Sequence, residues 1–279
     1  MKYLKIILLI IIYTLPVFSQ QKEEKYPVEV SEIKGDLNSK DLYKKDFGRY
    51  DGYQIDLYQG EAVHFLAYSK NFQPSIALVN SKGEIVVQSK RNQDKYAEMI
   101  CSIVASDKYV IYVIGSEHES GKYTLQTAVA EPKALNPALD LNFCDGMEFL
   151  ASHSRAHFTF IENPEIFKKE LMRLENSIDV YMDEEYGAYK AVFYSGSELQ
   201  KAESVFNSIK NSVQNCLDAS WKVTSTDWKK VDPGRSKSSI FTEIENGIER
   251  YIKVSITDNA GTDHPAEKKF SVEIEINRK

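Results

Sequence analysis

The stretch Tyr53-Gln54-Ile55-Asp56-Leu57 alternates apolar and polar side chains, which is the two-residue period of a β-strand with one buried face. Similar short runs follow it, and polar turns such as Asn80-Ser81-Lys82-Gly83 separate them. The other strand-like runs are residues 63–67, 75–79, 84–88, 97–104, 109–114 and 122–129. Short strands joined by regular turns, without a good helix, predict an antiparallel β-sandwich over residues 35–130.

Turn glycines and the residues beside them form a second pattern in the same region. It consists of Gly35-Asp36-Leu37, Tyr50-Asp51-Gly52-Tyr53, Gly60-Glu61, Phe72-Gln73-Pro74, Lys82-Gly83 and Gly121-Lys122-Tyr123-Thr124-Leu125. In these features residues 35–130 resemble the bacterial pre-peptidase C-terminal (PPC) domain. The resemblance implies a jelly-roll-like sandwich of secreted proteins, with a binding or solubility role rather than catalysis.

One segment departs from that family. Many members carry an acidic pair after the fourth strand that can hold calcium. Here the segment is Gln88-Ser89-Lys90-Arg91-Asn92-Gln93-Asp94, which is basic and would repel a divalent cation. No recognisable peptidase domain accompanies the module either, and we expect no metal or other cofactor.

The amino terminus predicts export. Lys2 and Lys5 precede an apolar run, Ile6 to Tyr13, and Val17-Phe18-Ser19 has the spacing of a cleavage site. We therefore predict a signal peptide over residues 1–19 and a flexible leader over residues 20–34. The alternative is a retained membrane anchor, but the run is shorter than the roughly 20 residues that a span needs. The mature protein is expected in the periplasm, at the cell surface or in the medium, without a stable membrane span.

The charge balance argues against two classes of partner. The chain has a formal net charge of −6, which becomes −8 when Lys2 and Lys5 leave with the signal peptide. A mildly acidic chain without a basic cluster is a poor binder of nucleic acid or of an anionic membrane surface. The expected partner is an extracellular protein or polysaccharide.

The second half has a different pattern. Two prolines, Pro132 and Pro137, mark a linker over residues 131–139, and residues 140–279 form the predicted second domain. Apolar residues at three- and four-residue steps predict a helix from Phe143 to Ser154, and a longer helix opens at Ser197 with a capping-box pattern. The predicted strands are residues 177–183, 189–195, 221–228, 238–245, 249–257 and 269–276. This order predicts an α+β domain, with helices packed on one face of an antiparallel sheet.

The chain has three cysteines, so an oxidising compartment leaves one unpaired. Cys144 and Cys216 both fall on predicted helices of the second half, and we predict a disulfide between them. Cys101 lies in an apolar strand pattern and is expected to be a small buried hydrophobic residue.

The candidates for chemistry are few. His153 and His157 are four residues apart on a predicted helix end, but the Glu of a His-Glu-x-x-His motif is missing, so we expect two solvated histidines. Asp183-Glu184-Glu185 lies at a tight turn without a calcium-loop pattern, and we expect solvated charge. Phe193-Tyr194-Ser195-Gly196-Ser197 lacks the first glycine of a nucleophile elbow. We predict no catalytic residue.

Tyrosines are the remaining candidates for a binding surface. Tyr50, Tyr53, Tyr58 and Tyr68 cluster in the first module, and such side chains are frequent at recognition surfaces. They are also ordinary strand residues, so packing is the alternative.

These observations favour a secreted, non-enzymatic binding protein with the sandwich as its recognition module. The first alternative is a secreted hydrolase whose site lies in the second domain, built from His153, His157 and residues 183–185. A second is an accessory subunit of another envelope protein, which should carry an exposed apolar patch.

Overall fold

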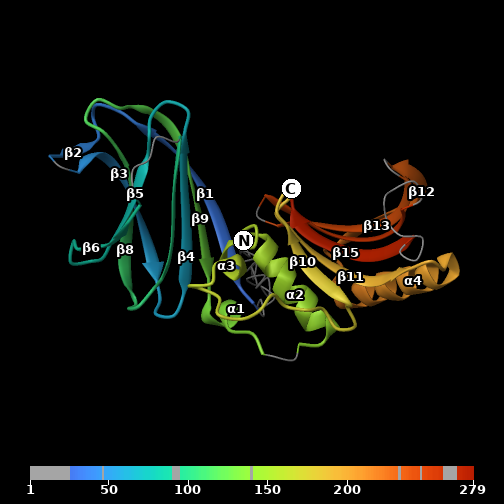
Figure 1. The fold of residues 1–279 in the computed structure, drawn as a ribbon. Helices are drawn as coiled ribbons and strands as arrows, with labels where there is room; N and C mark the ends of the chain where they lie inside the picture. Colours follow the sequence, from blue (N-terminus) through green and yellow to red (C-terminus); the bar gives the residue numbers. More distant parts are fainter. Residues whose placement is uncertain are drawn as a thin grey trace, which may run out of the picture.

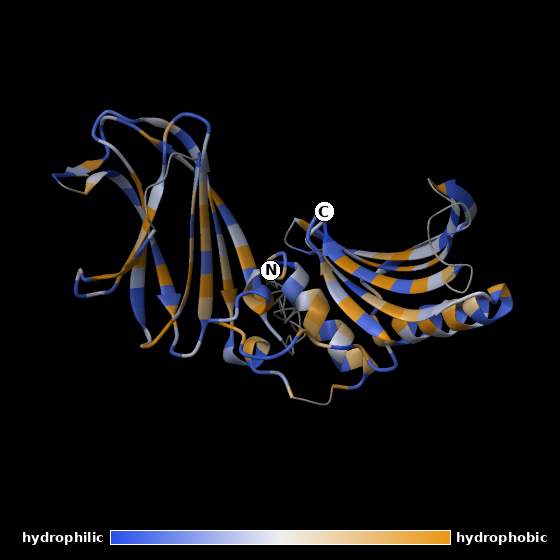
Figure 2. Cartoon of the chain, in the orientation of Figure 1, coloured by the Kyte–Doolittle hydropathy of each residue, from blue (hydrophilic) through white to orange (hydrophobic). Residues whose placement is uncertain are grey.

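The computed structural model describes residues 26–45, 47–89, 95–138, 141–231, 234–245, 247–259 and 269–279. The predicted signal peptide (residues 1–19), the first part of the leader and residues 90–94 of the basic segment lie outside the described residues. The chain is mostly antiparallel β-sheet with a few helices (Figure 1). Orange and blue alternate along many of the strands in Figure 2, which is the pattern from which strands were predicted.

Residues 28–130 form two facing antiparallel sheets. One sheet has the strand order β1-β9-β4-β7 and the other β2-β3-β8-β5-β6. The strands are β1 Val28–Leu37, β2 Leu42–Lys44, β3 Gly48–Leu57, β4 Ala62–Ser69, β5 Ser75–Val79, β6 Ile85–Gln88, β7 Tyr96–Ser102, β8 Asp107–Gly115 and β9 Gly121–Ala130. Inward side chains such as Phe65, Ile111 and Leu125 fill the space between the sheets. The predicted sandwich is therefore present, and β1 and β2 add to the strands that the sequence predicted.

The prediction of a flexible leader is wrong for residues 28–34. They belong to β1, which pairs with β9 along its whole length, from Val28 opposite Ala130 to Leu37 opposite Gly121. Val28 packs on one face of the sheet and Leu37 on the other, because the strand's apolar residues change face between residues 30 and 33. No single alternating run therefore marks this strand in the sequence.

Gly35 lets an aromatic ring cross β1. A Cβ atom at Gly35 would lie 2.2 Å from Cζ of Tyr123, so any larger residue would displace the ring. The Tyr123 hydroxyl donates to Asp51 Oδ2 at 2.7 Å and also hydrogen-bonds the Tyr53 hydroxyl, at 2.5 Å between oxygens. Burial raises the pKa of Asp51, although the bond from Tyr123 opposes the shift. Gly35, which the sequence pattern assigned to a turn, thus lies within β1 and has a packing role inside the sandwich.

The second half contains a six-stranded antiparallel sheet with the order β10-β11-β15-β14-β13-β12. Its strands are β10 Asp179–Asp183, β11 Ala188–Gly196, β12 Lys222–Val231, β13 Gly234–Glu245, β14 Ile248–Asp258 and β15 Phe270–Arg278, and its helices are α1 Pro132–Leu135, α2 Phe143–Ser154, α3 Thr159–Glu162 and α4 Leu199–Cys216. Helices α2 and α4 pack on the sheet face that carries Ile252, Val254 and Ile274. The two long helices, the hairpin and the later strands agree with the prediction.

One local prediction in this half is wrong. The α4 amino terminus is capped at Glu198, without a side-chain cap bond, so the box predicted between Ser197 and Gln200 does not form. The segment predicted as a linker contains the one-turn helix α1, with Pro132 in its first turn. Proline fits there because the first N–H groups of a helix have no intrahelical partner.

One hydrophobic cluster crosses the predicted linker. The outer face of the four-stranded sheet carries Val28 and the small residues Ala62, Ala128 and Ala130, and these belong to the same buried cluster as the α2 core. Small side chains let the helices approach the sheet closely. The Tyr26 ring, just before β1, meets the Phe149 ring of α2 edge-on, 5.3 Å between centroids. The halves are packed together, and their division into separate domains stays a prediction.

The structure contains the disulfide between Cys144 and Cys216, 72 residues apart in sequence, and it joins the start of α2 to the end of α4. Cys101 is free and half-buried, and burial raises the pKa of its thiol to about 11.

We expect the double variant Cys144→Ser/Cys216→Ser to lose about 4 kcal/mol of unfolding free energy, because the crosslink removes the closure entropy of a long loop from the unfolded chain. Urea unfolding checks this, with Cys101→Ala as the matched single-cysteine control. Equal losses in the two proteins, or a free thiol at both positions in unreduced mass spectrometry, would contradict the assignment.

Candidate functional site

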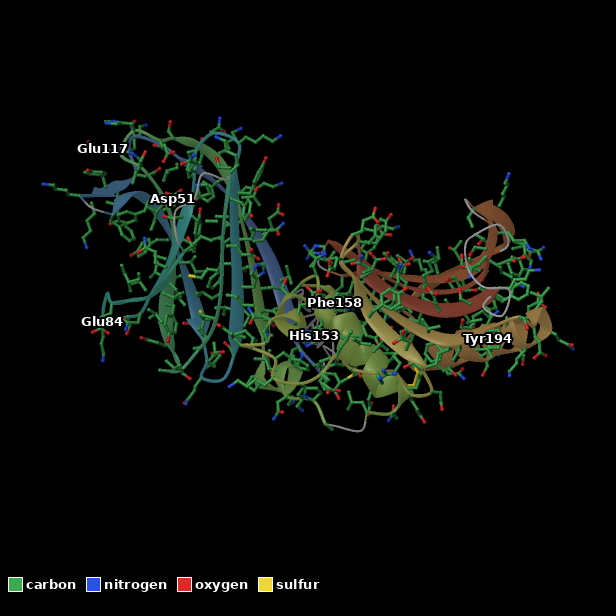
Figure 3. All side chains as sticks on the ribbon, viewed as in Figure 1. Asp51, Glu84, Glu117, His153, Phe158 and Tyr194 are labelled. Atoms are coloured by element: carbon green, nitrogen blue, oxygen red, sulfur yellow. A yellow bond between two sulfur atoms is a disulfide. The ribbon has the colours of Figure 1, made fainter. Side chains whose placement is uncertain are left out.

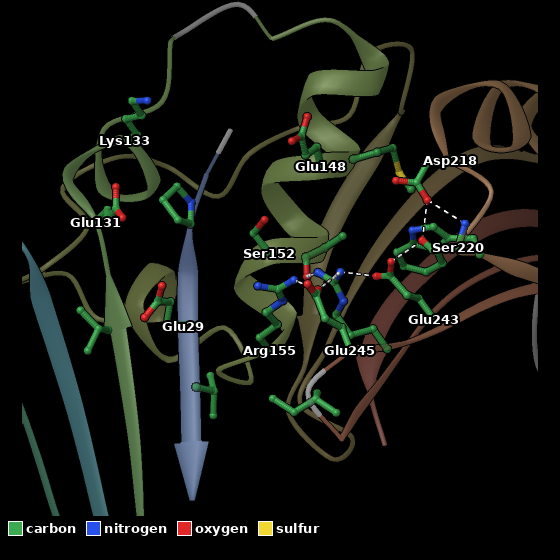
Figure 4. A pocket seen from close by; sticks show the side chains of 18 of the residues that line it. Glu29, Glu131, Lys133, Glu148, Ser152, Arg155, Asp218, Ser220, Glu243 and Glu245 are labelled. Carbon is green, nitrogen blue, oxygen red and sulfur yellow. Dashed lines mark hydrogen bonds and ion pairs between the residues drawn. The ribbon is translucent and has the colours of Figure 1, made fainter. Parts of the chain in front are cut away.

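A cleft of about 970 Å³ lies between the sandwich and the second half (Figure 4). We call it the junction cleft. One wall comes from β1 and β9, and the opposite wall from α2, β13, β14 and the segment after α4. Its lining includes Glu29, Val30, Glu131, Glu148 and Trp221, together with four charged residues that form its inner part.

The inner part is a cluster of two arginines and two glutamates, Arg155, Arg250, Glu243 and Glu245, which we call the Arg–Glu cluster. Each arginine is only 7% exposed. Arg250 binds Glu243 closely and donates to Glu245 Oε2 at 3.4 Å and to the Ala151 carbonyl at 2.9 Å. Arg155 binds Glu245 closely and donates to the carbonyl oxygen of Val28, at 3.4 Å. Because Val28 is in β1, the cluster links the two walls.

The strand register explains the cluster. Glu243 on β13 lies directly opposite Arg250 on β14. Both lie on the sheet face that elsewhere buries Phe241 and Ile252, since side chains alternate along a strand. The charged pair therefore lies on the apolar face of the sheet that the helices cover, where that face meets α2. Burying these charges is energetically possible because each has a partner of opposite sign.

Arg250 has further neighbours. Its guanidinium carbon lies 5.5 Å from the centre of the Trp221 ring, and the Ser220 hydroxyl donates to Glu243 Oε1 at 2.5 Å. Burial and then the positive charge of Arg155 lower the pKa of Arg250, while Glu243 acts in the opposite direction. Within the described residues the Nε atom of Arg250 is buried without a hydrogen-bond partner.

The disulfide supports this wall. Cys144 and Cys216 both line the junction cleft, and Ser220 and Trp221 follow Cys216 closely in sequence. The bond fixes the end of α4 against α2, and with it the position of the Trp221 ring beside Arg250.

The two histidines do not share a site. His153 is fully buried and its Nε2 hydrogen-bonds the Ala134 carbonyl at 2.9 Å, so the expectation of a solvated side chain is wrong. It lies in the middle of the molecule on α2 (Figure 3). His157 is exposed and accepts a hydrogen bond from Arg278 Nε, at 2.5 Å between nitrogens. Burial lowers the pKa of His153 to about 4. The pKa of His157 is also lowered to about 4, because its ring is desolvated on the side that packs on the protein, although the residue is exposed, and because the charge of Arg278 adds to the effect.

The acidic turn also stands apart. Asp183 ends β10 and pairs with Lys190 across the hairpin at 2.5 Å, and this bond lowers the pKa of the carboxyl group. Neither residue lines the junction cleft. In the described ranges no three or more His, Cys, Asp or Glu side chains are grouped to hold a metal ion.

The four tyrosines do not form one surface. Tyr50 packs edge-on against Tyr112 on the outer side of β3, whereas Tyr53 faces the sandwich core. Tyr58 lies in the turn after β3, and Tyr68 lies opposite Tyr96 on the outer face of β4. Tyr58 and Tyr68 are both exposed. A binding role for these side chains stays a prediction.

The Arg–Glu cluster was not among the sites that the sequence predicted. The sequence does contain a pattern that points to it. Glu243 and Glu245 lie two and four residues after the apolar Phe241, so all three side chains fall on the same face of the predicted strand. In the same way Arg250 falls on the face of Ile252 and Val254. Charged residues at inward positions of a strand indicate either a strand end or a buried ion pair.

No protein-family model matches the chain, and no curated protein matches it in sequence. Solved structures similar in part include the pre-peptidase C-terminal domain of a collagenase from Bacillus anthracis, at 17% identity over 35% of this chain and 87% of that chain, with a TM-score of 0.28. Another is PliG of Aeromonas hydrophila, a periplasmic inhibitor of g-type lysozyme, at 14% identity over 37% of this chain and 86% of that chain, with a TM-score of 0.27. A third is a low-affinity xylan-binding module from Roseburia intestinalis, at 13% identity over 38% of this chain and 89% of that chain, with a TM-score of 0.26. Likeness at this level carries no argument about activity.

Of the helices in the described part of the chain, none has the length and apolar character needed to cross a membrane.

We expect Arg250→Met to lower the free energy of unfolding by about 3–5 kcal/mol, because Glu243, whose side chain is only 12% exposed, loses its charge partner. Urea titration measures the loss. Lys279→Met is the matched control, since Lys279 pairs with Glu249 at the surface and such pairs contribute about 1 kcal/mol or less. Equal effects of the two substitutions would contradict the buried cluster.

His153 makes stability depend on pH. Its pKa of about 4 in the folded protein lies below its ordinary value of 6.5, so the unfolded chain binds the proton more readily. Its contribution is complete above pH 6.5 and is lost as the pH falls toward 4, on the order of 3 kcal/mol in all. Urea midpoints across this range should fall less steeply in His153→Gln, whose amide can still donate to Ala134. An identical pH slope in both proteins would count against this assignment.

Proposed function

We propose that the chain is a secreted binding protein and that the junction cleft is its ligand site. The single observation that carries the proposal is the cleft itself, about 970 Å³ in volume, lined from both halves and anchored by the two buried arginines of the Arg–Glu cluster. Pockets of this size between packed units are the usual place for ligands. The cluster and the disulfide hold the walls before a ligand arrives, which lowers the ordering cost of binding.

The PPC-like character of residues 35–130 belongs to the same proposal. In this arrangement the sandwich is more than a neighbouring module, because β1 and β9 supply one wall of the site. The ligand would be an extracellular protein segment or a polysaccharide, in keeping with the export signal predicted at residues 1–19.

The geometry supports binding over hydrolysis at the residues first considered. His153, His157 and Asp183 are each hydrogen-bonded to a different partner, Ala134, Arg278 and Lys190 respectively. A hydrolase built from them would need these side chains to converge on one bound substrate. The accessory-subunit alternative has less support, because strongly exposed apolar side chains such as Leu42, Val104 and Ile244 lie in different parts of the fold.

The test is a binding panel on the mature protein, with xylan, peptidoglycan fragments, gelatin and lysozyme as probes in calorimetric titrations. We expect saturable binding of at least one probe at micromolar concentration, without release of products. The variant Glu148→Trp, which places a large ring in the cleft from α2, should weaken that binding, whereas Glu165→Trp outside the cleft should not. Absence of binding, or binding that ignores Glu148→Trp, would overturn the proposal. Hydrolysis of a probe that is lost in His157→Ala or Asp183→Asn would favour the hydrolase.

A further inference from the structure

The edge of β1 at the junction cleft has backbone groups available for pairing. Strand β1 is the edge strand of its sheet, with β9 on one side only. The Pro27 carbonyl accepts a bond from the Glu131 N–H, which shows that the odd-numbered residues of this segment face β9. In an antiparallel pair the alternate residues point their N–H and C=O groups the other way. The even-numbered residues, Val30, Glu32 and Lys34, therefore present these groups to the outer edge.

Two contacts support this direction. The carbonyl of Val28 accepts from Arg155 on the far wall of the cleft, so it points away from β9. The carbonyl of Asp36 accepts from the Asn38 side chain. These bonds close the two ends of the edge, and among the described residues no hydrogen bond occupies the outward groups of Val30, Glu32 and Lys34. An open strand edge is a template for another extended chain.

The charge of the cleft determines which peptide ligand it favours. Its described lining has six acidic side chains, Glu29, Glu131, Glu148, Asp218, Glu243 and Glu245, against three basic ones, Lys133, Arg155 and Arg250, a net charge of −3. The two arginines are paired with Glu243 and Glu245, so the negative charge on the sandwich wall comes from Glu29 of β1 and Glu131 just after β9. A cationic ligand is favoured electrostatically at such a surface.

A peptide backbone with basic side chains matches both the open strand edge and the negative charge beside it, whereas a neutral polysaccharide matches neither.

We propose that an extended, lysine- or arginine-rich segment of a protein partner binds in the junction cleft at Val30 and continues as a further strand along the edge of β1, beside Glu32 and Lys34. This inference rests on the proposed function and narrows its ligand to one class.

The experiment uses fluorescence polarisation with the mature protein and a labelled peptide of about eight residues, alternating lysine with threonine or valine. We expect a micromolar Kd that rises about fivefold or more between 50 and 300 mM salt, because mobile ions screen the charges. The same sequence with glutamate for lysine should not bind. A version N-methylated on alternate amides keeps the charge but cannot pair with the strand, and should bind about tenfold more weakly, the loss of one or two hydrogen bonds.

Protein variants test the same two features. Val30→Pro removes one outward N–H and should raise the Kd about tenfold, while Val30→Ala keeps the N–H and should change it less than about threefold. Glu29→Gln/Glu131→Gln should weaken binding at low salt, and Glu165→Gln/Glu170→Gln, outside the cleft, should not. If Val30→Pro does not fold, the N-methylated peptide still tests strand pairing.

Each remaining outcome decides the matter. Equal affinity for the methylated peptide, or for the glutamate peptide, would overturn strand addition of a basic segment. If the basic peptide fails but xylan or gelatin binds in a Glu148→Trp-sensitive way, the inference falls and the proposed function stands; if nothing binds, both fall. Self-association that disappears in Val30→Pro would assign the edge to a second copy of the chain and overturn a separate partner.

Discussion

The four-stranded sheet of the sandwich is buried on both of its faces. Val28, Ala62, Ala128 and Ala130 point away from the sandwich core, yet they lie in the same hydrophobic cluster as the centre of α2 and the six-stranded sheet. A sheet face that packs on helices cannot move freely against them, because close-packed interiors have few alternative arrangements. The junction cleft is the space left where this contact ends, so its shape depends on the shared core.

The polar contacts at the cleft fit that view. Arg155 connects β1 to β13, and Arg250 connects β14 to α2, so four elements from both halves meet through two buried guanidinium groups. Buried ion pairs contribute little net stability, but they define register and orientation, because a shifted arrangement would leave a charge unpaired. The disulfide acts on the same wall from outside. A site held in this way suits a binding protein whose ligand meets prearranged groups.

The sequence predicts helices and strands well where one face of the element is buried and the other faces solvent. The strands around residues 53–57 and 249–257 and the helix at residues 143–154 were predictable for this reason. Strand β1 was not, because it buries opposite faces at its two ends. The cleft was also beyond reach, since Glu243 and Arg250 come close only through the pairing of β13 with β14, and Arg155 only through the contact of α2 with the sandwich. Burial of His153 is likewise a property of the junction, which no local pattern encodes.

The continuity of the core across the junction is tested most directly by unfolding. Both tryptophans, Trp221 and Trp228, lie in the second half, whereas Phe65 is buried in the sandwich core. Phe65→Ala should cost about 3–5 kcal/mol in the sandwich. Tryptophan fluorescence then follows unfolding of the second half in urea, and hydrogen exchange of the sandwich amides follows unfolding of the sandwich. If the halves share one cooperative core, Phe65→Ala lowers the urea concentration of half-unfolding to the same extent by both measurements. An unchanged tryptophan midpoint, with only the sandwich destabilised, would contradict the account.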